Sequence, residues 1–185
     1  MTARYRFDPS QSRFQVHAFA TGMLSMFAHS PTFAVRNFRG SVGIEGPDFR
    51  ALTLDLVVIA DSLELVDRVG AGDRQEIEGR MRKEVLETAR YPELRYEAAG
   101  SRSEPNGPNR HRIHLDGRLS LHGVTRAHGC DVELLVKSDG LILRGESLLK
   151  MPEYRISPVT ALGGTIRLKD ELAVSFDIAC YPEGS

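Results

Sequence analysis

The side chains best suited to metal chemistry are four histidines that fall within residues 111–128. Imidazole is a common ligand of zinc and other transition metals. His111 and His114 are three positions apart, which places them on opposite faces of an extended strand, and His114 and His122 lie about 27 Å apart along a straight strand. We therefore expect these histidines, with His128, to lie on the surface or at the rim of the fold. A metal-binding protein or enzyme that uses His111, His122 and His128 is the alternative.

Other chemistry-bearing groups are sparse. The sequence contains no nucleophile-elbow, phosphate-loop, zinc-protease or dinucleotide motif, so we expect no enzymatic activity and no cofactor. Asp73 and Glu76 could pass for paired catalytic carboxylates, but a helix that begins at Asp73 explains both residues. The two cysteines, Cys130 and Cys180, match no metal-binding spacing, and we expect both to be free, buried thiols.

Length and composition indicate one ordinary globular domain. The chain has 185 residues, of which 41% are hydrophobic and 26% are charged, and its net charge is −1. We expect a single domain over residues 1–185, with no nucleic-acid partner because no overall charge attracts one. No apolar run is long enough for a transmembrane helix. The first ten residues, MTARYRFDPS, do not resemble a signal peptide, so a cytoplasmic location is expected.

Period-two alternation of apolar and polar residues dominates the chain and predicts strands with one buried face. The clearest example runs from Ile113 to Leu121, and the C-terminal half repeats it several times. Gly123, Asp139-Gly140 and Lys169-Asp170 separate these runs as hairpin turns do. We predict an all-β fold, an extended antiparallel barrel of about eight strands, because closure leaves no exposed strand edge. A two-sheet sandwich is the competing architecture.

Two segments interrupt the strands. Asp73 followed by Glu76 predicts a helix from Asp73 to Leu86, whose apolar stripe of Ile77, Met81 and Val85 would pack onto the barrel. The segment from Gly22 to Val35 is unusually apolar for a connection between strands, and it would serve either as an inward-folded plug or as a ligand portal.

The inward face of the strands decides what the barrel could hold. A barrel of this size is either filled by side chains or wide enough for one small ligand. An apolar interior favours an apolar guest, because each buried CH₂ gains about 0.8 kcal/mol. The same residues could instead pack a dry core, and such a filled barrel would act only by protein contacts, including a homodimer through the sheet face around Val57 and Ile59.

Several short motifs along the chain resemble those of the YceI-like lipid-binding proteins. They are Tyr5-Arg6-Phe7-Asp8-Pro9 with Ser12, Phe38-Arg39-Gly40, Arg74, Tyr91-Pro92 with Leu94 and Tyr96, and the specific run from Gly117 to Arg126, GRLSLHGVTR. The resemblance implies a lipocalin-like barrel that binds a polyisoprenoid or a similar lipid, with no catalytic residues. Members of the family are often exported.

We therefore predict non-catalytic binding, carriage or sequestration of an apolar lipid, a polyisoprenoid or an isoprenoid quinone, in the barrel interior. The predicted lipid-binding residues share the inward parity of their strands. They are Phe14, Val16, Ala18, Leu54, Leu56, Val58, Leu94, Tyr96, Ile113, Leu115, Leu119, Leu121 and Phe176.

Overall fold

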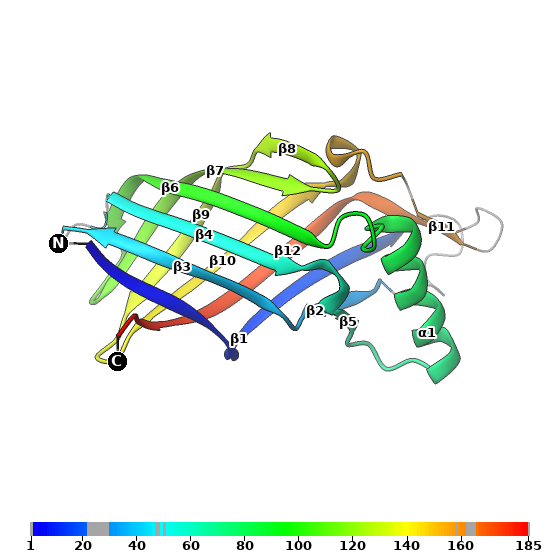
Figure 1. Ribbon diagram of the computed structural model, residues 1–185, viewed down its shortest axis with the longest axis horizontal. Helices are drawn as coiled ribbons and strands as arrows, with labels where there is room; N and C mark the ends of the chain where they lie inside the picture. The colour runs from blue at the N-terminus through cyan, green and yellow to red at the C-terminus, as the bar shows by residue number, and fades with distance from the viewer. Residues whose placement is uncertain are drawn as a thin grey trace.

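The computed structural model describes residues 2–21, 30–46, 49, 51–157, 159–161 and 166–184. Eight antiparallel strands of this part of the chain form a closed barrel (Figure 1), so the barrel prediction is confirmed and the sandwich alternative is wrong. Around the barrel the strands are β1 (Thr2–Thr21), β3 (Phe38–Glu45), β4 (Ala51–Ile59), β6 (Glu93–Pro105), β7 (Arg110–Leu121), β9 (Cys130–Val136), β10 (Leu141–Lys150) and β12 (Ile166–Pro182). β12 then pairs with β1 and closes the ring.

Four short strands extend the sheet beyond the ring. β2 (Thr32–Val35) pairs with β1 and with β5 (Leu63–Leu65), β8 (Val124–Ala127) pairs with β7, and β11 (Thr160–Ala161) pairs with β12. The termini lie at one end of the barrel, and the helix α1 lies at the other (Figure 1). The predicted plug or portal, Gly22 to Val35, falls partly on residues 22–29, which are outside the described residues.

The turns follow the predicted positions with one exception. His122 and Gly123 have φ values of 52° and 73°, the left-handed pair that a tight hairpin between two strands requires. Asp139-Gly140 lies in the turn between β9 and β10. The turn expected at Lys169-Asp170 is wrong, because both residues lie inside β12, where its register with β1 is irregular. A bulge introduces polar residues into a strand without ending it.

The helix begins earlier than the predicted start at Asp73. α1 spans Ala71–Arg80, its N-cap is Gly70 with no side-chain capping bond, and Met81–Val85 continues it as one π-helical turn. Asp73 therefore lies in the first turn, where a carboxylate is stabilised by the helix dipole rather than by capping geometry. Ile77 and Met81 pack against the main hydrophobic core as expected.

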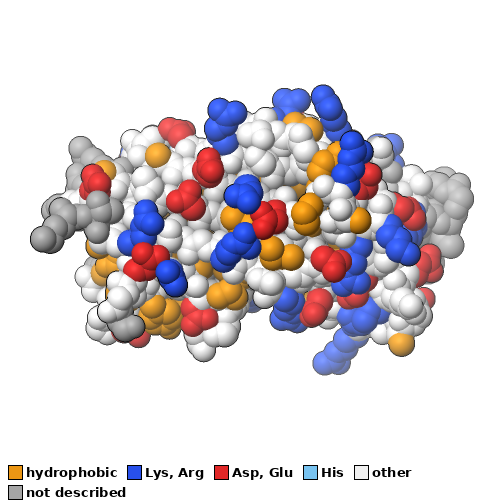
Figure 2. Space-filling model, in the orientation of Figure 1, with side chains coloured by type: hydrophobic (Ala, Val, Ile, Leu, Met, Phe, Trp, Pro, Cys, Tyr) orange, Lys and Arg blue, Asp and Glu red, His pale blue; other side chains and the backbone are white. Residues whose placement is uncertain are grey.

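The face of the molecule in view in Figure 2 carries both acidic and basic side chains, which are intermingled over it. Several of them form cross-strand ion pairs on the outside of the barrel, such as Arg39–Glu93 at 2.7 Å and Arg144–Asp177 at 2.6 Å. The inward parity is apolar, so charge and hydrophobicity separate across the wall as the alternation predicts.

Candidate functional site

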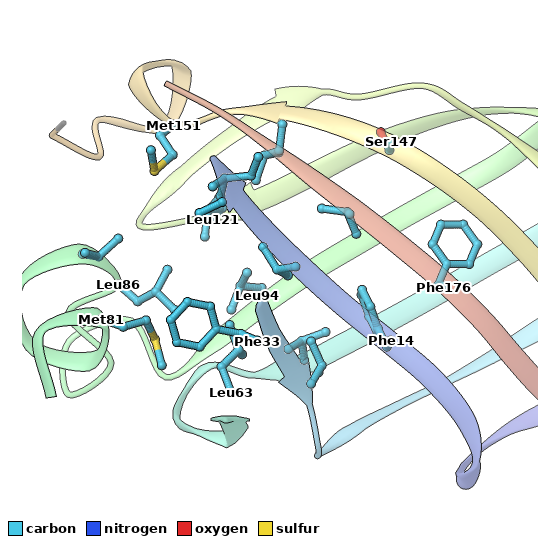
Figure 3. Close-up of a pocket in the computed structure, with 18 of the residues that line it drawn as sticks. Phe14, Phe33, Leu63, Met81, Leu86, Leu94, Leu121, Ser147, Met151 and Phe176 are labelled. Atoms are coloured by element: carbon cyan, nitrogen blue, oxygen red, sulfur yellow. The ribbon is translucent and has the colours of Figure 1, made fainter. Parts of the chain in front are cut away.

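A cavity of about 580 Å³ occupies the half of the barrel nearer to α1. This volume lies within the usual range for small-molecule sites. Its wall consists mostly of aliphatic and aromatic side chains from the strands, and Met81 and Leu86 from the helical segment line it at the α1 end (Figure 3). Phe14 and Phe176 lie deeper, in edge-to-face contact at a centroid distance of 6.3 Å. The arrangement suits an elongated apolar guest.

The predicted inward residues can be compared with this wall. All of them except Ile113 line the cavity: Phe14, Val16, Ala18, Leu54, Leu56, Val58, Leu94, Tyr96, Leu115, Leu119, Leu121 and Phe176. Ile113 is fully buried in the packed part of the core, at 0% exposure. It is thus inward-facing, but it lies outside the cavity because the barrel is filled at its level. Their role in binding a lipid stays a prediction.

A second set of residues lines the cavity without having been predicted as lipid-binding from the sequence. They include Phe33, Leu63, Leu65, Met81, Leu86, His128, Cys130, Ser147, Met151 and Ile156. Strands β2 and β5 are too short for alternation to be read, which hides Phe33, Leu63 and Leu65. His128 was expected at the surface or rim, and this expectation is wrong, because its side chain lines the cavity. It shares the inward parity of Cys130 and Val132, which also line the cavity. Extending the alternation of β9 by two residues toward the N-terminus would have predicted that His128 faces inward.

Four residues of the wall with hydrogen-bonding side chains form a connected group on one side. The His128 Nε2 and Ser147 Oγ atoms lie 2.8 Å apart, and the Tyr96 hydroxyl donates to the His128 carbonyl at 3.0 Å. The same hydroxyl lies 3.6 Å from the Cys130 sulfur. We call Tyr96, His128, Cys130 and Ser147 the interior polar group.

Burial keeps the interior polar group uncharged. Desolvation lowers the pKa of His128, although Glu153 opposes the shift, and desolvation raises the pKa of Tyr96 and of Cys130. At neutral pH the imidazole, phenol and thiol are therefore all neutral. Cys180, fully buried elsewhere, has its pKa raised to about 12 by burial. Both cysteines are free, as predicted, but Cys130 is only partly buried because it faces the cavity.

Arg74 fixes α1 to the barrel. Its guanidinium donates to the Leu65 carbonyl and to the Asp67 carbonyl, the latter at 2.9 Å. Glu78 accepts from the Leu65 amide at 3.0 Å and pairs with Arg74 at 3.8 Å. These bonds join the helix to β5. An arginine suits this position, since its planar guanidinium can reach two carbonyls at once.

The histidines do not assemble into a metal site. His111 packs on Phe49 at 4.5 Å, and both ring nitrogens of His122 have partners, Glu87 at 2.6 Å and the Tyr154 carbonyl at 3.3 Å. Across the described part of the chain, no three His, Cys, Asp or Glu side chains come together in a way that could hold a metal ion. The described residues therefore give no support to the alternative of a metal site formed by His111, His122 and His128.

The fold and its cavity define a class of protein, the lipocalin-like barrels with a hollow apolar interior. The chain belongs to the YceI-like family, whose domain matches residues 5–180. Within the described residues, no helix is long and apolar enough to cross a membrane. A search among curated proteins found no match.

Solved structures share the fold at low sequence identity. BcnA of Burkholderia cenocepacia is 13% identical with a TM-score of 0.69, over 94% of this chain and 98% of that one. A polyisoprenoid binding domain from Saccharophagus degradans, implicated in plant cell wall breakdown, is 15% identical with a TM-score of 0.67, over 96% and 98%. The YceI protein of Campylobacter jejuni, as a mutant with a monobromobimane guest, is 12% identical with a TM-score of 0.61, over 82% and 84%.

Proposed function

We propose that this protein binds an apolar lipid, a polyisoprenoid or an isoprenoid quinone, in the barrel interior, and that it carries or sequesters this lipid without catalysis. The observation behind the proposal is the cavity of about 580 Å³ with its apolar wall. A hydrocarbon chain gains about 0.8 kcal/mol for each CH₂ buried in such a wall. The domain from Saccharophagus degradans is described as polyisoprenoid binding, which supports the isoprenoid class.

Native mass spectrometry of gently purified protein, followed by solvent extraction, tests this proposal. We expect a bound mass that extracts as an isoprenoid, or uptake of an added polyprenol by the bare protein. Leu119 lines the cavity, so Leu119→Trp should reduce uptake. Leu148 is 60% exposed, and Leu148→Trp is the matched control that should leave uptake unchanged. Bare protein that also rejects prenyl lipids would contradict the proposal.

A homodimer through Val57 and Ile59 stays a separate prediction. Both residues are partly exposed on the outer face of β4. Their cross-strand neighbours are Arg39, Arg95 and Glu93, which pair with one another on the surface. Size-exclusion chromatography with light scattering measures the mass in solution, and a monomer at high protein concentration would contradict the dimer.

A further inference from the structure

The interior polar group lies where the backbone pairing between β9 and β10 ends. β9 begins at Cys130, and β10 pairs with β9 only from Leu141 to Gly145. Farther along β10, Ser147 pairs in the backbone with β12 alone. Beyond the last paired residues of β9 and β10, the side-chain hydrogen bond between His128 and Ser147 connects the segment before β9 to β10. Hydrogen-bonding atoms are thereby placed in a mostly apolar wall.

The bond to His128 does not exhaust the capacity of the Ser147 hydroxyl, which offers one donor and two acceptor positions. If the imidazole Nε2 donates, the hydroxyl proton is available to a ligand oxygen. If Nε2 accepts, the serine oxygen can still accept from a ligand hydroxyl. Both Ser147 and His128 line the cavity.

The charges around the cavity select against an anion. In the described lining, the only cations are Arg80 and Arg95. Arg80 pairs with Glu84 and donates to the Thr160 carbonyl at 2.9 Å, and Arg95 pairs with Glu93 on the outer surface.

Three carboxylates, those of Asp67, Asp73 and Glu76, lie in the lining contributed by α1 and by the segment before it. A phosphate placed there would meet like charge. Deeper in the barrel, the same phosphate would lose its hydration beside neutral groups.

We infer that the interior polar group is the headgroup subsite of the cavity, and that it takes an uncharged headgroup with a carbonyl or hydroxyl oxygen in preference to a phosphate ester. This inference rests on the proposed function. The lipid would enter with its oxygen-bearing end toward Ser147, and its hydrocarbon chain would extend along the apolar wall toward α1. A ligand that is hydrocarbon alone would leave the bond between His128 and Ser147 unchanged.

The test compares four probes of matched chain length by native mass spectrometry titration: a prenylated quinone, a prenyl alcohol, a prenyl pyrophosphate and an isoprenoid hydrocarbon. We expect the quinone or the alcohol to bind at least about tenfold more tightly than the pyrophosphate. Ser147→Ala should weaken binding of the preferred probe by roughly threefold to tenfold, the usual effect of one hydrogen bond, and it should not change binding of the hydrocarbon. The quinone and alcohol arms distinguish a carbonyl from a hydroxyl.

Ser120→Ala is the matched control, because the Ser120 hydroxyl bonds to Thr125 on the outside of the barrel. It should change binding of none of the probes. The imidazole ¹⁵N chemical shifts of His128 should move when the preferred probe is added, and not when the hydrocarbon is added. This second measurement holds even if Ser147→Ala folds poorly.

The outcomes separate the two proposals. If the pyrophosphate binds as tightly as the neutral probes, or if Ser147→Ala weakens the hydrocarbon equally, the headgroup assignment is wrong while lipid binding stands. If no prenyl probe binds, the proposed function fails and the subsite fails with it.

Discussion

The two halves of the barrel are built from the same residue types but reach different densities. Toward the termini, Val42, Leu52, Ile113 and Leu134 are each at most 1% exposed, and none of them lines the cavity. Toward α1, leucines, valines and phenylalanines of the same inward parity surround a cavity of about 580 Å³. We refer to these as the packed half and the hollow half. Hydrophobic composition therefore does not decide whether a barrel is filled.

The difference lies in how each end is closed. In the packed half, connections of four residues join β6 to β7 and β9 to β10, and these strands stay paired up to their connections. In the hollow half, β9 and β10 separate, and α1 with the short strands β2 and β5 lies at the end. A lid made of separate elements leaves interior space that paired strands would have filled.

The largest expected effect compares one leucine from each half. Leu134→Ala in the packed half should lower the free energy of unfolding by about 2–5 kcal/mol, because it opens a cavity in a close-packed core. Leu56→Ala in the hollow half should cost about 1–2 kcal/mol, because Leu56 already borders a void and loses only transfer energy. Urea unfolding of both variants measures the difference. Equal costs would show that the hollow half is as densely packed as the other half.

The sequence predicts which side chains face inward because alternation is a local property of the strand. The inward orientation of Leu119 and Leu121 could be predicted from the residues next to them, and the barrel could be predicted from the repetition of the alternating pattern. The space between facing strands is a different matter, because it depends on contacts far apart in the chain. Ile113 and Leu119 have the same parity on the same strand, yet the first lies in the packed half and the second lines the cavity.

The second prediction tests the direction in which Leu119 faces. Leu119→Glu would place a carboxylate in the apolar wall and should lower the free energy of unfolding at neutral pH by about 1–3 kcal/mol. Arg118 is exposed on the opposite face of β7, and Arg118→Glu should stay within about 0.5 kcal/mol of the wild type. Thermal unfolding of both variants is sufficient for the comparison. An unchanged melting temperature for Leu119→Glu would place this side chain in solvent.

Side-chain partners of the polar residues were less predictable than the strands. Asp73 is a residue type that often caps helices, but the N-cap of α1 is Gly70. No local signal in the sequence distinguishes a helix that starts after Gly70 from one that starts at Asp73. His128 bonds to Ser147, nineteen positions later on another strand. This contact depends on how β9 and β10 are paired and on where that pairing ends, and alternation by itself gives no register between strands.

The third prediction concerns the lid of the hollow half. Arg74→Ala removes the bonds to the Leu65 and Asp67 carbonyls and should destabilise the fold by about 1–2 kcal/mol, the usual range for hydrogen bonds from a charged donor at a partly exposed site. Amide exchange should rise in α1 and stay unchanged in β9. Arg68→Ala, at an exposed position on the same connection, is the control. Equal exchange increases in both segments would mean that Arg74 supports the whole barrel rather than its lid.

The smallest effect is a pH dependence of stability that His128, in the hollow half, should produce. Burial lowers the pKa of His128 below its ordinary value of 6.5, against the opposing charge of Glu153. As pH falls below about 6.5, the unfolded chain takes up a proton at this residue before the folded protein does. The free energy of unfolding therefore decreases toward acid pH. Above about pH 6.5, the contribution of His128 to stability is complete. His128→Gln should flatten this part of the stability curve between pH 8 and 5.

A bound lipid sharpens the same measurement. A ligand seated against His128 would remove further water from the imidazole, and desolvation disfavours its charged form. The wild-type slope between pH 8 and 5 should therefore become steeper when the preferred probe is present, whereas His128→Gln should show the same slope with and without it. If the wild type and His128→Gln have identical slopes, His128 titrates alike in the folded and unfolded chain. Water would then fill the cavity at the interior polar group, and the contrast between the two halves would lie in hydration rather than in apolar space.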